Sequence, residues 1–386
     1  MSSSFIHQPA GIYIHVPFCR KKCAYCDFYS LTDQSLIDAY VTALKKEAAM
    51  VLSEKAMAVD TIYFGGGTPS VLNLNQITEI ISLINLLSNI YTDSEITVEV
   101  NPESAGREWL KAVREAGVNR VSIGIQSFDD NALAFLGRIH SAGRGLEAVA
   151  AARSAGFDNI GLDIIYGLPG QTRTDLEADL SRAIALAPEH ISCYLLTMET
   201  GTPLEGALRR KAFVPLSDAR QSDLFLAAAE VLTANGYLHY EISNFACRPE
   251  TRSRHNTKYW QRVPYAGLGP AAHSYTGSVR YWNVRDVSDY VERLSADRSP
   301  RQADELLTAR QKMMESLYLG LRLAEGLEID AFNREFSTDF QILFAPVLAE
   351  HRSTGMLEMA QGRCRLSTRG MLFHETIAAE LAGLLE

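Results

Sequence analysis

The first 200 residues alternate short apolar, β-rich runs with amphipathic helical stretches, and this alternation constrains the fold most strongly. It predicts a parallel sheet covered by helices. Six β/α units fit a full barrel, an incomplete barrel or an open doubly wound sheet. Because two further units do not follow, we expect an α/β fold with a partial (β/α)6 barrel. The expected strands are Gly11–Val16, Thr61–Gly65, Ile96–Val100, Val121–Gln126, Ile160–Ile165 and Ile191–Leu196, and the expected helices between them are Ser35–Ser53, Asn75–Asn89, Arg107–Ala116, Arg144–Ala155 and Asp175–Ala187.

The sequence changes character after about residue 200. Residues 217–235 have the pattern of one more amphipathic helix, and a stretch rich in aromatic residues and glycine follows. From Leu306 a helical series ends in a hairpin-like segment, Met356–Leu366, which resembles a winged-helix unit. Residues 301–386 carry 9 basic and 13 acidic side chains, which is a poor electrostatic match for DNA. We therefore expect a barrel over 1–235, an aromatic-rich extension over 236–305 and a C-terminal module over 306–386 that packs or docks a partner.

The composition limits the functional classes. The 37 basic and 46 acidic residues give a net charge of −9, which argues against a general nucleic-acid binder. No apolar run approaches the roughly 20 residues that a membrane helix needs. The stretch Met1–Phe5 lacks the basic and apolar regions of a signal peptide. We expect a cytoplasmic protein with at most peripheral membrane contact.

Three cysteines, Cys19, Cys23 and Cys26, share one short loop in a C-x-x-x-C-x-x-C spacing. Three thiolates can hold three irons of a [4Fe–4S] cluster and leave the fourth iron open for a small molecule. A zinc site usually needs a second pair of ligands at short spacing, and the sequence offers none. A disulfide framework would need an oxidising compartment. The sequence thus predicts these three cysteines as the metal ligands, whereas the other three, at 193, 247 and 364, receive no role.

Polar residues and glycines occupy the carboxyl ends of the expected strands, where parallel β/α folds place their chemistry. Each has a purely structural explanation: the glycine turn is a tight connection, Glu99 pairs with a basic residue, and Asp163 caps a helix. Their gathering at one edge instead favours a ligand site, with glycine N–H groups available to it. The set comprises the turn Gly65–Pro69, then Glu99, Gln126, Arg138 and Asp163.

These motifs together resemble the oxygen-independent coproporphyrinogen oxidase-like group of radical S-adenosylmethionine (SAM) proteins. The resemblance covers most of the chain and is carried by Tyr13–Phe28, Gly65–Pro69, Glu99, Gln126, Arg138 and Asp163–Thr172. It implies a radical SAM barrel, a [4Fe–4S] cluster and bound SAM. The positions that it implies for SAM are Tyr13, Tyr25, Gly66, Gly67, Thr68, Glu99, Gln126, Arg138 and Asp163. Gly66–Thr68 would face the methionine amino group.

Within this group the sequence is closer to the HemW-type haem chaperones than to the decarboxylating dehydrogenases. The dehydrogenases have the pattern C-x-x-x-C-x-x-C-x-C, whereas here Phe28 occupies the position of the last cysteine. They also have a longer N-terminal segment, whereas here only 18 residues precede Cys19. The run His255–Trp260 matches an HNxxYW motif of the chaperones. His255 is a candidate haem ligand, and nine tyrosine and tryptophan residues between 237 and 290 offer flat surfaces for a porphyrin. Alternatively, these aromatic side chains form an ordinary core edge and His255 bonds to a backbone carbonyl.

Three functional hypotheses follow. The first is a haem chaperone that binds a cluster, SAM and haem and transfers haem to apo-haemoproteins such as respiratory enzymes. The second is an oxygen-independent coproporphyrinogen III dehydrogenase that uses a 5′-deoxyadenosyl radical. The third is an interaction protein with a structural cluster. We assign no catalytic residue.

Overall fold

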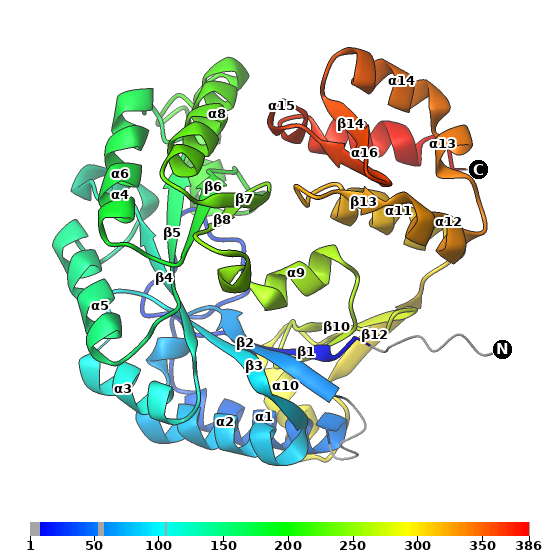
Figure 1. Cartoon of the computed structure of the whole chain (residues 1–386). Helices are drawn as coiled ribbons and strands as arrows, with labels where there is room; N and C mark the ends of the chain where they lie inside the picture. The colour runs from blue at the N-terminus through cyan, green and yellow to red at the C-terminus, as the bar shows by residue number, and fades with distance from the viewer. Residues whose placement is uncertain (1–7, 53–57, 105, 386) are drawn as a thin grey trace. The chain divides into compact units, whose positions relative to one another are not determined.

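A computed structural model of the chain describes residues 8–52, 58–104 and 106–385 (Figure 1). Ser53, the expected end of the first helix, lies outside them, as does Met1–Phe5. The chain forms two compact units. The first consists of Met1–Gly161, Glu199–Thr202 and Val263–Leu306, and the second of Leu162–Met198, Pro203–Arg262 and Leu307–Glu386.

The first unit is built on parallel strands with helices between them. Its strands β1 (Ala10–Val16), β2 (Ala58–Gly66), β3 (Asn89–Val100) and β4 (Arg120–Gln126) are neighbours in that order. All seven residues of β4 are buried, as expected for a parallel strand covered on both faces. The helices are α1 (Ile37–Leu52), α2 (Leu74–Leu87), α3 (Arg107–Glu115), α4 (Asp130–Leu136) and α5 (Ala142–Ser154).

Local sequence signals explain where several of these helices begin and end. The Asn73 side chain accepts a hydrogen bond from the N–H of Gln76, and the Gln76 side chain accepts one from the N–H of Asn73, so that α2 starts with a capping box. Ser141 caps α5 with a single hydrogen bond, which its side chain accepts from the N–H of Arg144. Gly137 ends α4 in the left-handed conformation, with φ of +77°.

Four further strands extend this sheet beyond β1. The strand β9 (Tyr265–Leu268) pairs with β1 in parallel, and β10 (His273–Tyr275), β11 (Val279–Asn283) and β12 (Arg301–Leu306) continue in antiparallel order (Figure 1). Helix α10 (Val287–Ser295) lies between β11 and β12 in sequence. The sequence analysis did not predict these strands, because each is short and their aromatic residues were assigned to an extension.

The second unit contains the remaining predicted β/α elements and a helical module. Its strand order is β5 (Ile160–Tyr166, which starts in the first unit), β6 (His190–Leu195), β8 (Asn244–Ala246) and β7 (Leu238–Glu241), and β6 pairs with β8 in antiparallel. Its helices before the module are α6 (Arg173–Ala185), α7 (Pro203–Arg209), α8 (Asp218–Ala234) and α9 (Arg254–Trp260). Within the described residues, the strands of neither unit close into a full barrel.

The last 80 residues form helices around a small antiparallel sheet. The helices are α11 (Ala309–Gly320), α12 (Ile329–Phe336), α13 (Phe340–Leu343), α14 (Ala345–Ser353), α15 (Thr368–Met371) and α16 (His374–Ala382). The sheet order is β13 (Leu327–Glu328), β15 (Arg363–Leu366) and β14 (Leu357–Ala360), so the predicted hairpin is present. No described helix combines the length and apolar composition that crossing a bilayer requires. The division at residues 235 and 305 stays a prediction.

Candidate functional site

The loop after β1 carries the three cysteines and is held in place by backbone hydrogen bonds. The N–H of Cys19 donates to the carbonyl of Leu31 over 2.9 Å, and the N–H of Leu31 donates to Pro17 over 2.8 Å. Farther along, the N–H of Ala24 donates to Leu136 at the end of α4 over 3.2 Å. The loop is therefore tied at its first cysteine and again between Cys23 and Cys26, which restrains its backbone.

Each of two thiols accepts a hydrogen bond from a side chain of the strand-end set. The hydroxyl of Thr68 lies 3.4 Å from the sulfur of Cys19, and a guanidinium nitrogen of Arg138 lies 3.4 Å from the sulfur of Cys23. Burial raises the pKa of Cys19 and raises that of Cys26 to about 11, which favours the thiol form of both. All three cysteines are free of disulfides.

The donor set is chemically suited to an iron–sulfur cluster. The described residues contain no group of three or more His, Cys, Asp or Glu side chains gathered around one metal position. Zinc needs its ligands around one point, whereas each thiolate of a cluster binds a different iron, so the sulfurs lie farther apart. Three soft sulfur donors on one restrained loop therefore match the prediction of a [4Fe–4S] cluster.

The glycine turn after β2 packs directly against this loop. Gly66 has a φ of +101°, and a Cβ atom there would lie 2.4 Å from the His15 imidazole. A Cβ at Gly67 would lie 2.7 Å from the carbonyls of Val16 and Phe18. The N–H groups of Gly67 and Thr68 donate to those same carbonyls over 2.9 and 2.8 Å. The N–H of Gly67 is thus occupied, which differs from the expectation that the glycine N–H groups of this turn are available to a ligand.

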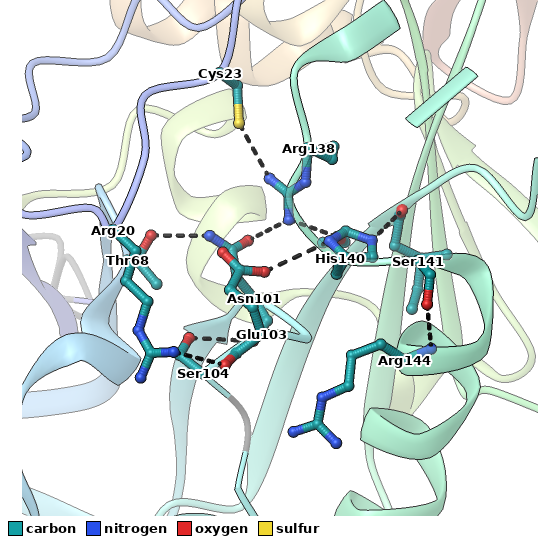
Figure 2. Close-up of polar contacts among 12 residues, drawn as sticks. Arg20, Cys23, Thr68, Asn101, Glu103, Ser104, Arg138, His140, Ser141 and Arg144 are labelled. Atoms are coloured by element: carbon teal, nitrogen blue, oxygen red, sulfur yellow. Dashed lines mark hydrogen bonds and ion pairs between the residues drawn. The ribbon is translucent and has the colours of Figure 1, made fainter. Parts of the chain in front are cut away.

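A chain of hydrogen bonds joins the second thiol to the threonine of the glycine turn (Figure 2). One terminal nitrogen of Arg138 donates to the sulfur of Cys23, and the other donates to the side-chain Oδ1 of Asn101 over 2.7 Å. The Asn101 amide nitrogen then donates to the hydroxyl of Thr68 over 2.8 Å. The sequence analysis did not single out Asn101, although its position just after the third strand was the available signal.

Arg138 is nearly buried and is charged in this setting. Burial disfavours the charge, but Tyr25, Cys23 and Glu103 outweigh that effect and raise the pKa of Arg138. Arg138 also donates to the carbonyl of Gly124 over 2.9 Å. Tyr25 in turn has a pKa raised by burial, against the pull of Arg138. A fixed positive charge therefore stands beside the cysteine loop.

Two tyrosines and a glutamate line the same face of β1, β2 and β3. The hydroxyl of Tyr63 donates to Glu99 over 2.7 Å, and the rings of Tyr63 and Tyr13 stack at 6.3 Å. The hydroxyl of Tyr13 donates to Nδ1 of His15, whose Nε2–H donates to the carbonyl of Tyr29 over 2.9 Å. Burial lowers the pKa of His15 to about 4, so this imidazole is neutral. His15 and Tyr63 were not predicted; their alternation with Tyr13 and Glu99 on neighbouring strands was the missed signal.

Gln126, at the carboxyl end of β4, shows the local strain that often marks a ligand site. Its φ is +67°, a conformation that non-glycine residues rarely adopt. The side chain is buried, and its Oε1 atom has no hydrogen-bond partner among the described residues. A Cβ at Gly124 would lie 2.9 Å from Gln126 Nε2 and 3.0 Å from Asn101 Oδ1, so a side chain there would displace these two amides. A bound polar group would satisfy the buried oxygen.

The remaining two predicted residues belong to the second unit. Asp163 lies on β5 and is partly buried. His255 lies on α9, is 0% exposed, and its Nε2 is 2.8 Å from the hydroxyl of Tyr259. The described first unit therefore contains Tyr13, Tyr25, Gly66, Gly67, Thr68, Glu99, Gln126 and Arg138 with the three cysteines, and neither Asp163 nor His255.

Comparison with protein families identifies two regions of the chain. Residues 13–183 match the Radical SAM superfamily, and residues 307–373 match the HemN C-terminal domain. The first region includes all of the candidate site in the first unit, and the second starts where the helical module starts.

Comparison with individual proteins gives relatives over nearly the full length. The chain is 35% identical to "Heme chaperone HemW" of Mycobacterium tuberculosis, over 97% of this chain and 95% of that protein. It is 33% identical to the protein of the same name from Bacillus subtilis, over 97% and 99%. Among solved structures, coproporphyrinogen III oxidase (HemN) from Escherichia coli matches with a TM-score of 0.83 at 23% identity, over 98% of this chain and 91% of that one. This structural likeness confirms the α/β radical SAM fold with its C-terminal helical module.

Proposed function

The chain belongs to the HemW family of radical SAM proteins, and we propose from this premise that it is a haem chaperone. It would bind haem and pass it to apo-haemoproteins, for which respiratory enzymes are the proposed acceptors. The observation that carries the proposal is the full-length similarity to proteins named Heme chaperone HemW. Phe28 supports the proposal. This phenylalanine is 64% exposed, and it occupies the position of the last cysteine in the C-x-x-x-C-x-x-C-x-C pattern of the dehydrogenases.

We propose that Cys19, Cys23 and Cys26 hold a [4Fe–4S] cluster and that the adjoining strand ends hold SAM. Such a cluster, when bound, supplies an open iron and a source of single electrons. The chain itself contributes two things. The fixed charge of Arg138 suits a carboxylate, and the unpaired Oε1 of Gln126 suits a donor group. The SAM set is completed by Tyr13, Tyr25, Gly66, Gly67, Thr68, Glu99 and Asp163.

Haem transfer separates this proposal from the alternatives. The reconstituted protein, loaded with one equivalent of haem under anaerobic conditions, would be mixed with an apo-cytochrome whose absorption changes on filling. We expect transfer to the apo-cytochrome and no decarboxylation of coproporphyrinogen III. Turnover of coproporphyrinogen III would instead establish the dehydrogenase, and failure to bind either haem or SAM would leave an interaction protein with a structural cluster.

A further inference from the structure

The histidines of the chain differ sharply in how available they are to an iron atom. Eight of the nine lie within the described residues. Seven of these are buried or half-buried, and each has a ring nitrogen within hydrogen-bond distance of another group: His15, His140, His190, His239, His255, His351 and His374. The eighth, His273, is exposed, and no hydrogen bond of its ring is found among the described residues. Histidine is a common ligand of haem iron, and among the described histidines His273 is the one whose side chain is exposed.

His273 stands on a flat aromatic surface of the first unit. It lies on β10 directly opposite Trp282 of β11, and the two rings stack at 5.6 Å with an angle of 25° between their planes. The next pair on the same face is Tyr275 opposite Arg280, whose guanidinium lies 5.9 Å from the tyrosine ring. Tyr275 is also in register with Tyr265 of β9. Cross-strand partners point to the same side of a sheet, so these five side chains share one face.

This face is continuous with the face that carries the candidate SAM residues. Gly267 of β9 is in register with Tyr13 of β1, and Tyr13 is in register with Tyr63 of β2. The opposite face is closed: Asn283, the residue after Trp282, is buried and donates to Glu47 of α1. A ligand at His273 would therefore approach from the side of the sheet on which Tyr13 lies.

The chemistry of the surface matches an anionic, planar macrocycle with a metal at its centre. Partial burial, followed by the nearby charge of Arg280, lowers the pKa of His273, so its imidazole is neutral near pH 7 and offers a lone pair. Tyr275 is buried, whereas Tyr265 and Trp282 are half-buried and offer apolar contact area for a porphyrin. Arginine is the side chain best suited to pair with carboxylates such as haem propionates.

We propose that His273 ligates haem iron on this surface, with Trp282 supporting the ligating imidazole by stacking and Arg280 near a propionate. This inference rests on the proposed haem chaperone function and names its binding site. It differs from the sequence-based expectation, which gave the ligand role to His255. In the structure His255 is fully buried and bonded to Tyr259, so ligation there would require α9 to open.

Anaerobic titration with ferric haem, followed by absorption and electron paramagnetic resonance spectra, tests the site. The samples would be wild type, His273→Ala, His273→Cys, His255→Ala and the control Thr276→Ala, an exposed residue just beyond β10. We expect His273→Ala to weaken haem affinity at least tenfold and to remove the histidine-ligated spectrum. The His273→Cys protein should acquire the spectrum of a thiolate ligand, whereas His255→Ala and Thr276→Ala should match wild type.

The outcomes separate failure of the site from failure of the function. Absence of stoichiometric haem binding by wild type overturns both the chaperone proposal and this one. If His273→Ala and His273→Cys bind haem with the wild-type spectrum, only this inference is overturned. If haem binding is instead lost in His255→Ala, the ligand lies on α9. Thermal melts of the two His273 variants verify that the loss is not unfolding, and the thiolate spectrum of His273→Cys identifies direct ligation independently of affinity.

Discussion

Gly66 shows how closely single residues are fitted around the cysteine loop. Its φ of +101° and the His15 ring, 2.4 Å from where a Cβ would stand, penalise any side chain twice. We expect Gly66→Ala to lower the free energy of unfolding by about 2 kcal/mol or more. Urea denaturation measures it. The matched control is Gly156→Ala, where φ is +87° but no atom lies within 4 Å. Equal losses in both proteins would show that the contact with His15 costs nothing.

Arg138 is expected to tune the cluster through its hydrogen bond to Cys23. A charged donor beside a cluster sulfur stabilises the more negative, reduced state, so its removal makes reduction harder. A hydrogen bond to a charged group contributes about 1.5–3 kcal/mol, and 1.4 kcal/mol corresponds to about 59 mV for one electron. We predict that Arg138→Gln lowers the reduction potential by about 60 mV or more, measured by a redox titration of the cluster's paramagnetic resonance signal.

The control for this variant is an arginine of the same region without a thiol contact. Arg144 on α5 forms a surface ion pair with Glu147, so Arg144→Gln should leave the potential unchanged. An unchanged potential in Arg138→Gln itself would mean that the Cys23 contact does not persist when the cluster is bound.

At the residue scale, sequence reasoning identified types of side chain better than their partners. The cysteine spacing and the strand-end positions were recognisable because they follow from ligand chemistry and from the parallel fold. Asn101 was missed because its role depends on bridging Thr68 and Arg138, two residues 70 positions apart in the chain. The burial of His255 was likewise unpredictable, since α9 carries no periodic apolar pattern that would indicate its inner face.

At the scale of elements, one buried carboxylate joins three of them. Glu47 of α1 accepts hydrogen bonds from the N–H of Gly269 after β9, from Asn283 of β11 and from the hydroxyl of Tyr290 of α10, over 2.5–2.7 Å. Burial nevertheless dominates and raises the pKa of Glu47 to about 7, with the three donors opposing it. The folded state thus holds a proton between the ordinary pKa of a glutamate and pH 7 that the unfolded state has lost.

The sign of the pH dependence follows from this difference in bound protons. Where the folded state binds more protons, stability falls as pH rises. A shift from 4.5 to about 7 corresponds to a loss of up to about 3 kcal/mol between pH 4.5 and 7. We predict that Glu47→Gln removes this decline, seen as a divergence of its unfolding free energies from those of wild type as pH rises from 5 to 8.

Comparison of the two proteins cancels the opposite contribution of His15, whose lowered pKa makes stability rise with pH. Glu79→Gln, in an exposed pair with Lys45, is the control and should follow wild type; a Glu47→Gln profile parallel to wild type would contradict the prediction.

The predictability of elements depended on their length and on local signals. Most strands and helices of the six β/α units were expected within three residues of their observed bounds, because each is long enough to show its period and several end at Gly or Pro. Two elements differ: β3 starts at Asn89 and not at the expected Ile96, and the short helix α4 was not predicted. The strands β9–β12 were missed, since three to six residues show no clear alternation, and β12 is almost wholly exposed. Their position beside β1 is set by pairing with residues some 250 positions earlier in the sequence.

At the scale of the whole chain, the sequence predicted a helical C-terminal module but not how it is joined to the rest of its unit. The N–H of Ala324 donates to the carbonyl of Tyr240 over 3.0 Å. Beside this bond the Arg322 guanidinium lies 3.0 Å from the carboxylate of Glu241, which is fully buried, and 4.3 Å from the Trp260 ring. Residues of β7, of α9 and of the module thus meet around one ion pair. A contact of this kind depends on long-range packing and has no signature in local sequence.

This ion pair should make the module and the β5–β8 part of the second unit unfold together. Arg322→Met would leave the Glu241 carboxylate buried with only two remaining donors, Ser243 N–H and the Asn244 amide. Breaking a buried pair on one side costs about 3–5 kcal/mol, and partial exposure of Arg322 reduces this to about 2 kcal/mol. We predict that loss for Arg322→Met, and a smaller loss for the double variant Glu241→Gln/Arg322→Met, because the double variant leaves no uncompensated charge. Thermal unfolding followed by far-UV circular dichroism, together with a double-mutant cycle, measures both. Strictly additive single losses would show that the two side chains do not interact, and the cooperativity of the unit would then have to come from its apolar packing.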